Sequence, residues 1–403
     1  MKKTLIALAA LAATASFAQS SVSIIGTLDL GIKANSAPTS NGASGTVGVS
    51  NPNTVQVAQN LTSTSSVKFL GVEDLGGGMK ASFVLEFNPT LTNSTLLDQT
   101  TTQAATYVGT PFNGEQYLGL SGNFGDVKLG VPNAGFFGVA MMASPLGTAM
   151  GSGYGASGVS RLGTAAPGIV SGVGSGTSRI VRHEKTIAYT TPNFAGFTAQ
   201  VDYALGNDNS TATSGTGNTD TYTGVALKYS KGALNVAYAY ANDKFGTNPL
   251  AGIYASSTGV LPGNGTTGVN LTSGALAGTD ISYHMLSGNY AFGAATVYAG
   301  YTNTKHNTSA VTTLEDASSW NIAGKYTMGS IDLLANYLVR TSNLTTANNA
   351  KLFGLGADYN LSKRTALTAR FELADNNTDS KVVSATAGGS VTNAFGVGIR
   401  HTF

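Results

Sequence analysis

Apolar and polar positions alternate along most of the chain, most clearly in residues 393–403. On one side of this stretch stand Phe403, His401, Ile399, Val397 and Phe395. On the other side stand small or charged residues, namely Thr402, Arg400, Gly398 and Gly396. Successive side chains of a β-strand point to opposite sides, so the pattern predicts a strand between two different environments. Because this strand runs to the last residue, we expect its apolar side to face lipid instead of a protein core.

The same alternation predicts sixteen strands. They span residues 22–33, 66–75, 79–88, 114–121, 126–131, 180–190, 196–205, 222–230, 233–241, 280–290, 294–304, 319–327, 331–340, 351–359, 364–374 and 393–403. Seven short turns alternate with eight long polar stretches, which cover residues 34–65, 89–113, 132–179, 206–221, 242–279, 305–318, 341–350 and 375–392.

This rhythm of connections bears on the fold class. Tight turns at one end, long loops at the other and an even number of strands are typical of a transmembrane β-barrel, in which closure of the sheet pairs every backbone group. The sequence therefore predicts an all-β fold, a 16-stranded antiparallel transmembrane β-barrel. A secreted β-sandwich or a repetitive adhesin shares the strand alternation and stays open as an alternative.

Aromatic residues gather beside the short turns. Examples are Tyr189, Phe194, Phe197, Tyr229, Tyr290, Phe292, Tyr326, Tyr359 and Phe403. Rings with a polar tip favour the interface between lipid and water, so we expect an aromatic band near the periplasmic rim. Ordinary strand propensity also favours Tyr and Phe and is the competing explanation.

The first residues have a different character. Lys2 and Lys3 precede a short apolar run, and Ala18 suits a small-residue cleavage site. This pattern predicts a signal peptide in residues 1–18 and a barrel domain in residues 19–403. A membrane anchor is the weaker alternative, because the apolar run is short for a membrane-spanning helix.

Composition excludes several classes of function. Without Lys2 and Lys3 the basic residues equal the 20 acidic ones, and a neutral chain argues against a nucleic-acid partner. Cysteine is absent, which excludes disulfides and thiolate metal sites. The four histidines are scattered, and neither an H-x-x-x-H nor a G-x-S-x-G motif occurs. We therefore expect no enzyme, no cofactor and no metal site, although a hydrolase with a serine and a histidine in one layer of strands is an alternative that sequence does not test.

A barrel of sixteen strands is wide enough to leave water inside, and the polar faces of the strands would line that water. Basic candidates on these faces are Lys33, Lys68, Lys128, Arg182, Lys228, Lys325, Arg340, Arg370 and Arg400. Acidic candidates are Asp29, Glu86, Glu115, Glu184, Asp202, Asp332, Asp358 and Glu372. Because the two signs nearly balance, ion preference depends on which charges line the narrowest point.

The third long stretch, residues 132–179, is the longest and is rich in Gly, Ala, Ser and Met. Its charged residues are Arg161 and Arg179, and no acidic residue occurs from Val127 through His183. A loop that is nearly uncharged is poorly suited to bulk water, so we expect it to fold into the lumen and to leave a positive bias there. A mobile outer loop is the alternative, since Gly-rich segments are flexible.

Several motifs carry a family resemblance. They are S-S-V-S-I-I-G-T-L-D-L-G at residues 20–31, G-V-E-D-L-G-G-G-M-K-A-S-F-V-L-E at 71–86, Y-L-G-L-S-G-N-F-G-D-V-K-L-G at 117–130, Y-T-T-P-N-F-A-G-F at 189–197, Y-N-L-S-K-R-T at 359–365 and V-G-I-R-H-T-F at the end. With these motifs the chain resembles the general porins of Gram-negative bacteria, in particular the neisserial and β-proteobacterial group, over nearly its whole length after residue 18.

The resemblance implies a homotrimer of sixteen-stranded barrels, a third loop folded into each pore, and passive passage of small hydrophilic solutes and anions. It also implies an outer-membrane location among lipid and lipopolysaccharide, and a terminal strand ending in Phe403 that is read by the barrel assembly machinery. Anion preference in the family rests on arginines, for which this chain has Ser66, Val131 and Ala188.

We therefore predict an outer-membrane diffusion channel with weak to moderate anion preference. The predicted pore-lining residues are Lys68, Lys128, Arg161, Arg182, Glu115, Arg370 and Arg400. A substrate-specific outer-membrane channel and a surface adhesin without conductance are the alternative functions.

Overall fold

The protein is described by a computed structural model that covers residues 21–35, 39–40, 54–92, 112, 114–148, 150–153, 181–205, 221–244, 280–306, 316–342, 349–376 and 390–403. The predicted signal peptide, residues 1–18, and Arg161 lie outside these residues.

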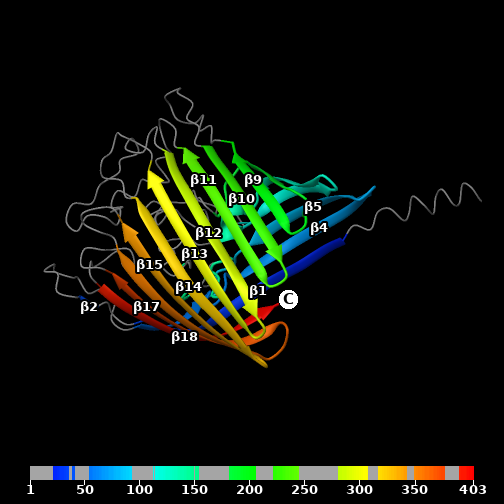
Figure 1. Cartoon of the computed structure of the whole chain (residues 1–403). Helices are drawn as coiled ribbons and strands as arrows, with labels where there is room; N and C mark the ends of the chain where they lie inside the picture. Colours follow the sequence, from blue (N-terminus) through cyan, green and yellow to red (C-terminus); the bar gives the residue numbers. More distant parts are fainter. Residues whose placement is uncertain are drawn as a thin grey trace, which may run out of the picture.

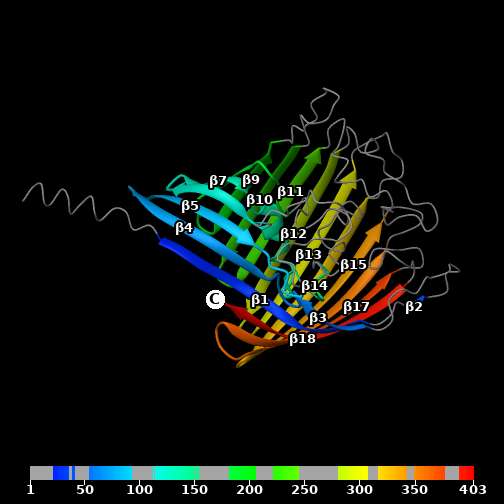
Figure 2. The same ribbon diagram turned by 180° about the vertical axis from the view of Figure 1, so that it is seen from behind.

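The described residues form one antiparallel sheet that closes on itself (Figures 1 and 2). Its strands are β1 (Ser21–Asn35), β2 (Thr39–Ser40), β3 (Thr54–Gln59), β4 (Ser66–Gly76), β5 (Met79–Phe87), β6 (Gln116–Gly122), β7 (Gly125–Val131), β8 (Thr186–Thr190), β9 (Phe197–Ala204), β10 (Thr221–Lys231), β11 (Leu234–Lys244), β12 (Asp280–Phe292), β13 (Ala295–His306), β14 (Ala317–Met328), β15 (Ile331–Ser342), β16 (Ala350–Asn360), β17 (Thr365–Asn376) and β18 (Ser390–Thr402). Residues 27–35 of β1 pair with residues 394–402 of β18, and this pairing closes the barrel.

The 18 named strands occupy sixteen strand positions around the barrel, the number that the alternation predicts. Of the two extra strands, β2 has only two residues. β3 and β4 share one strand position, because both pair with the same edge of β1. The long polar loop predicted over residues 34–65 therefore contains two strands, β2 and β3, that the alternation did not predict. The predicted strand at 180–190 is also shorter in the structure, since β8 begins at Thr186.

Side chains along each strand alternate between the two faces of the wall. In β14, Trp320 and Ile322 are exposed on the outer face, whereas Ser319 and Asn321 are buried on the inner face. The same holds around the ring: the buried side chains include Asp29, Glu86, Asp202, Asp243, Arg340, Asp358, Arg370 and Glu372, and the exposed ones are mostly large and apolar. A sandwich with a dry apolar core would show the reverse, so this inside-out distribution excludes the sandwich.

The predicted aromatic band is present on the outer face. Exposed rings beside the short turns are Tyr189, Phe194, Phe197, Tyr290, Phe292, Tyr326 and Tyr359. Two neighbouring pairs are in contact, with ring centroids 4.4 Å apart for Phe197 and Tyr229 and 4.6 Å apart for Tyr290 and Phe292.

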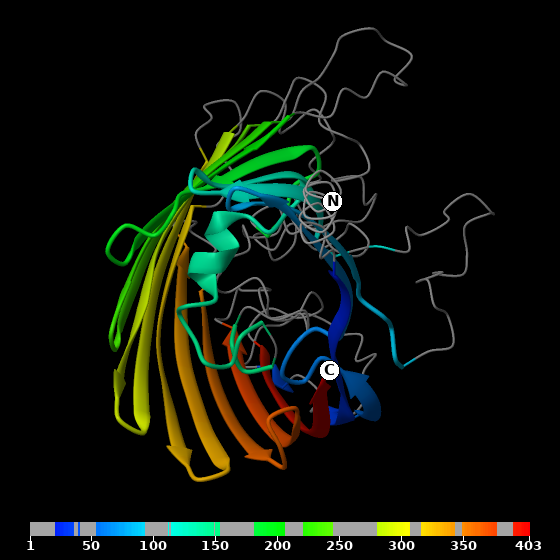
Figure 3. The same ribbon diagram turned by 90° about the vertical axis from the view of Figure 1, so that its right-hand side faces the viewer.

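Residues 132–148 and 150–153 follow β7 and include the short helix α2 (Gly135–Ala140). Viewed along the barrel, this helix lies inside the ring of strands (Figure 3). Phe136 and Val139 of α2 are fully buried in a cluster with small side chains of β10 and β11, such as Ala226 and Ala239. Among the described residues no helix is long and apolar enough to cross a membrane.

Candidate pore constriction

One group of charges lies on the inner face of β4, β5 and the start of β6. The amine of Lys68 is 3.4 Å from Oε2 of Glu86 and 3.5 Å from Oε2 of Glu115. Antiparallel pairing places Lys68 directly opposite Glu86, and the carboxylate of Glu86 also accepts a hydrogen bond of 2.8 Å from the backbone N–H of Glu115. These contacts hold two carboxylates around one amine.

The same group reaches both ends of the third loop. Oε1 of Glu115 accepts a 3.1 Å hydrogen bond from the backbone N–H of Asn133, at the start of the loop. Arg182, at its end, donates through Nη1 to Oδ1 of Asn133 at 3.1 Å. Burial lowers the pKa of Arg182, while the carboxylates of Glu86 and Glu115 raise it. A guanidinium remains protonated at any physiological pH, so Arg182 adds a fixed positive charge here.

Lys128 on β7 is the next cation along the wall. Its amine is 3.6 Å from Oδ2 of Asp126 and 4.6 Å from the centre of the Tyr117 ring, a cation–π geometry. Cross-strand pairing sets Lys128 between Gly119 and Ala188, so small neighbours leave its side chain room over the lumen.

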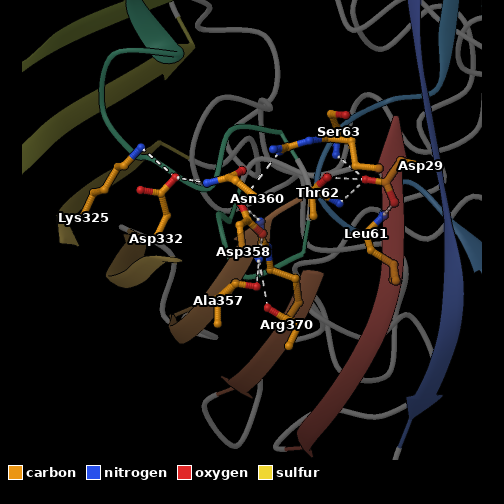
Figure 4. A network of polar contacts seen from close by, with 12 residues as sticks. Asp29, Leu61, Thr62, Ser63, Lys325, Asp332, Ala357, Asp358, Asn360 and Arg370 are labelled. Carbon is orange, nitrogen blue, oxygen red and sulfur yellow. Dashed lines mark hydrogen bonds and ion pairs between the residues drawn. The ribbon is translucent and has the colours of Figure 1, made fainter. Parts of the chain in front are cut away.

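A second group lies on β14 to β18 (Figure 4). Arg370 holds Asp358 with two parallel hydrogen bonds, Nη1 to Oδ1 at 2.7 Å and Nη2 to Oδ2 at 3.1 Å. Arg400 approaches the same carboxylate at 3.8 Å, and the Lys325 amine lies 3.2 Å from Asp332 nearby. A two-pronged arginine–carboxylate pair is strong and fixed in direction, so this part of the wall is rigid.

The structure thus gathers Lys68, Glu115 and Arg182 at one place and Arg370 with Arg400 at another. Lys128 lies beside the first group, and the position of Arg161 lies outside the described residues. Sequence reasoning did not select Asp126 or Asp243 as inner-wall residues, although both stand on the polar side of a predicted or observed strand.

The described part of the third loop runs along the inner wall and is tied to it strand by strand. Backbone carbonyls of the loop accept from wall side chains, Val139 from Ser287 at 2.6 Å and Ala143 from Asn321 at 2.8 Å. Backbone N–H groups donate to wall carboxylates in two places: Gly135 to Asp202 and Gly151 to Glu372, both at 2.7 Å. Asn336 donates to the carbonyls of Gly151 and Ser152 at 3.1 and 3.2 Å.

These ties turn the polar wall side chains toward the loop backbone along β9 to β17. From residue 132 to residue 153 the loop itself carries no charge. The charges beside this segment therefore come from the wall, among them Asp202 and Glu372, whose carboxylates accept hydrogen bonds from its backbone. Within the described ranges no cluster of three or more His, Asp or Glu side chains could hold a metal ion.

Comparisons with known proteins agree with this architecture. The family model described as Gram-negative porin matches residues 4–379. The chain is 31% identical to outer membrane porin protein 32 of Delftia acidovorans over 258 residues, which cover 62% of each protein. It is 27% identical to the major outer membrane protein P.IB of Neisseria meningitidis serogroup B over 248 residues, or 60% of this chain and 59% of that protein. The matched part therefore spans about three fifths of the length of these curated relatives.

Solved structures show the same fold. An anion-selective porin from Comamonas acidovorans aligns with a TM-score of 0.67 at 23% identity, covering 96% of this chain and all of that one. OmpT of Vibrio cholerae aligns with a TM-score of 0.61 at 16% identity, covering 95% of this chain and 98% of that one. With a family model that matches most of its residues and a closed barrel with a charged inner wall, the chain belongs to the Gram-negative porin family.

Proposed function

We propose that the protein forms a water-filled channel in the Gram-negative outer membrane, through which small hydrophilic solutes and ions diffuse passively, with a weak to moderate preference for anions. The observation that carries the proposal is the inside-out wall. Apolar side chains cover the outer face of a closed sheet, while charged and amide side chains line the inner face. A barrel of this size leaves an aqueous lumen. The proposal assigns the chain no catalytic role.

The preference for anions over cations is supported by the relative exposure of the cation and the carboxylate in each ion pair. Lys68 is 25% exposed, whereas its partners Glu86 and Glu115 are 9% and 13% exposed. Arg400 is 30% exposed above an Asp358 that is 7% exposed. Lys325 and Asp332 show the same order, and Lys128 with Asp126 shows the opposite one. In three of these four groups a cation lies nearer the water than its carboxylate, although Arg370 lies deeper than Asp358, at 2% against 7% exposed.

This arrangement supports a preference for anions that is modest. The opposing charges are close together, so their fields largely cancel at a distance. The family resemblance implies arginines at positions where this chain has Ser66, Val131 and Ala188. The cations Lys68, Lys128, Lys325, Arg370 and Arg400 each lie within 3.8 Å of a carboxylate. The anion-selective porin from Comamonas acidovorans, which shares the fold, supports the same sign.

Planar-bilayer recording tests the proposal. We expect stepwise conductance from the purified protein and a reversal potential in a KCl gradient that indicates a moderate excess of chloride over potassium permeability. Absence of channels from correctly folded protein would overturn the channel. A reversal potential dominated by potassium would overturn the anion preference alone.

We also propose the assembly that the family resemblance implies, in which residues 19–403 remain after removal of residues 1–18 and form a homotrimer among outer-membrane lipid and lipopolysaccharide. Phe403 is the proposed signal for the barrel assembly machinery. In the structure its backbone exchanges two hydrogen bonds of 3.0 Å with Gly26, so the last residue completes the closure of the barrel. Chemical cross-linking of intact outer membranes tests the trimer, and an exclusively monomeric species would contradict it.

A further inference from the structure

The strand position next to β1, which β3 and β4 share, is interrupted by an inward excursion, Asn60–Ser65. On β1, Leu30 pairs with Gln59 and Thr27 pairs with Ser66. Only residues 28 and 29 of β1 lie between these pairs, but residues 60–65 lie between them on the other strand. The chain must therefore leave the sheet and return within six residues. This is a much larger insertion than an ordinary β-bulge, which adds one residue.

A buried aspartate organises the excursion (Figure 4). The carboxylate of Asp29 accepts hydrogen bonds from the backbone N–H groups of Leu61 at 3.2 Å, Thr62 at 2.6 Å and Ser63 at 2.9 Å, and also one from the hydroxyl of Thr62. The backbone of Asp29 accepts from the N–H of Asn60 at 3.1 Å and donates to the hydroxyl of Ser65 at 3.0 Å. Asp29 is fully buried. Its charge is therefore used to fix the backbone of the excursion and is not presented to the lumen.

Leu61 is the one large apolar side chain that the excursion turns inward, and it fits against glycines of the wall. A Cβ atom placed on Gly396 or Gly398 would lie 3.0 Å from a methyl carbon of Leu61, so larger residues at these positions would crowd it. Leu61 is buried in a small cluster with Ala58, Ala394 and Met150. Of these residues, Met150 belongs to the third loop.

The excursion therefore meets the tip of the third loop, defined here as residues 146–148 and 150–151. A Cβ atom on Gly396 would also lie 3.6 Å from the sulfur of Met150, so Leu61 and Met150 share one patch of wall. A Cβ atom on Gly147 would lie 3.9 Å from the carbonyl oxygen of Thr62, which places the two backbones next to each other. On its other side the loop tip is tied to Glu372 and Asn336.

We propose that the excursion is the seat of the loop tip, with Asp29 and Leu61 as positioning residues that set the width and steadiness of the pore. The inference rests on the proposed channel function. The described part of the loop begins at β7 and reaches the strands beside β1, so the seat fixes this part far from where it begins. A Gly-rich segment is flexible by default, and fixing it at the far end is what keeps the open area constant. Without the seat, the tip would exchange between docked and undocked positions.

The first experiment compares Leu61→Ala with the conservative variant Leu61→Met in single-channel recordings. We expect Leu61→Ala to raise the undocked population of the loop tip about tenfold or more, the change that ~1.4 kcal/mol of lost contact produces. This appears as larger current fluctuations in the open state. Leu61→Met retains an apolar contact of similar volume and should keep the current of the unaltered protein. Thermal unfolding in detergent, measured alongside, should show a folded barrel in both variants.

A second experiment uses the absence of cysteine from the chain. In the double variant Leu61→Cys, Met150→Cys, a short thiol cross-linker should join the excursion to the loop tip in folded protein. We expect the cross-linked form to conduct quietly and the uncross-linked double variant to fluctuate as Leu61→Ala does. Failure of the two thiols to cross-link would contradict the contact.

Equal fluctuations before and after cross-linking, or a Leu61→Ala current identical to that of the unaltered protein, would overturn the role of the seat. The unaltered protein serves as the control in every recording. If the unaltered protein forms no channels, the proposed function fails. If it forms steady channels and the variants give the same current with the same fluctuations, only the role of the seat is refuted.

Discussion

Gly354 on β16 offers a sharp test of whether the third loop is docked where the structure places it. Its inner face touches the backbone of Gly151 so closely that a Cβ atom would lie 2.6 Å from both the Cα and the carbonyl carbon of Gly151, and closer still to its carbonyl oxygen. Side-chain rotation cannot relieve a clash with backbone atoms. In the variant Gly354→Ala the loop tip must therefore move away from the wall.

The magnitude follows from the hydrogen bonds that such a movement breaks. Gly151 donates to the buried carboxylate of Glu372, and Asn336 donates to the carbonyls of Gly151 and Ser152. A bond to a charged group contributes about 1.5–3 kcal/mol and each neutral bond about 0.5–1.5 kcal/mol, so the docked state stands to lose about 2.5–6 kcal/mol. Since ~1.4 kcal/mol is a tenfold change in an equilibrium, even a partial loss should leave the tip undocked for much of the time.

Single-channel recording is the assay, and we expect a higher mean conductance or frequent transitions between levels. The matched control is Gly324→Ala on β14, where the nearest atom to a new Cβ is the carbonyl oxygen of Thr296 at 3.9 Å. Both variants add one methyl group to a strand glycine, so the general effect of the substitution cancels. A Gly354→Ala channel with the conductance and noise of the control would refute the docked position of the loop tip.

Three further substitutions test the charges and the terminal residue. Glu115→Gln removes one of two carboxylates beside Lys68, so we expect the reversal potential in a salt gradient to shift toward stronger anion preference, and a shift toward cations would contradict the assignment. Arg370→Met leaves the buried carboxylate of Asp358 with only a more distant arginine, so we expect the unfolding free energy to fall by about 3 kcal/mol. Denaturant titration in detergent measures this loss, with a variant of an exposed lysine in a turn as the control. Phe403→Ala should lower the amount of folded barrel in outer-membrane fractions at equal expression, whereas an unchanged amount would show that the terminal ring is dispensable.

The barrel itself could be predicted from sequence because a lipid-facing wall imposes a period of two on every strand. In β17, Leu367, Ala369 and Phe371 face outward, with Thr368 and Arg370 between them facing inward. Each residue needs only its immediate neighbours to show its face. The pairing of Lys68 with Glu86 across the short turn includes a register shift between Asp74 and Gly76, which alternation alone does not predict.

The features that the sequence did not predict depend on contacts between residues far apart in the chain. Asn60–Ser65 reads as an ordinary polar connection, and its structure comes from Asp29, which lies 31 to 36 positions earlier. The contact of Leu61 with Met150 and the hydrogen bond from Gly151 to Glu372, 221 positions later, are equally invisible to local pattern. Asp29 was recognisable as a polar-face residue, but alternation does not distinguish a charge that faces water from one that binds backbone amides.

The layering of charges in the wall reconciles two requirements of a pore of this kind. A cation buried in the wall without a partner would cost several kcal/mol, and Lys68, Lys325 and Arg400 each lie beside a carboxylate. If the cation and the carboxylate of a pair were equally exposed, their charges would cancel for a passing ion. Placing the carboxylate of Glu86 or Asp358 beneath the more exposed Lys68 or Arg400 leaves a positive surface toward the lumen. Because the partner is close and salt screens exposed charges over about 8 Å, that surface acts only at short range, where the lumen is narrow. The position of the third loop therefore decides how strongly this wall discriminates between ions, and the seat beside β1 links pore width to ion preference.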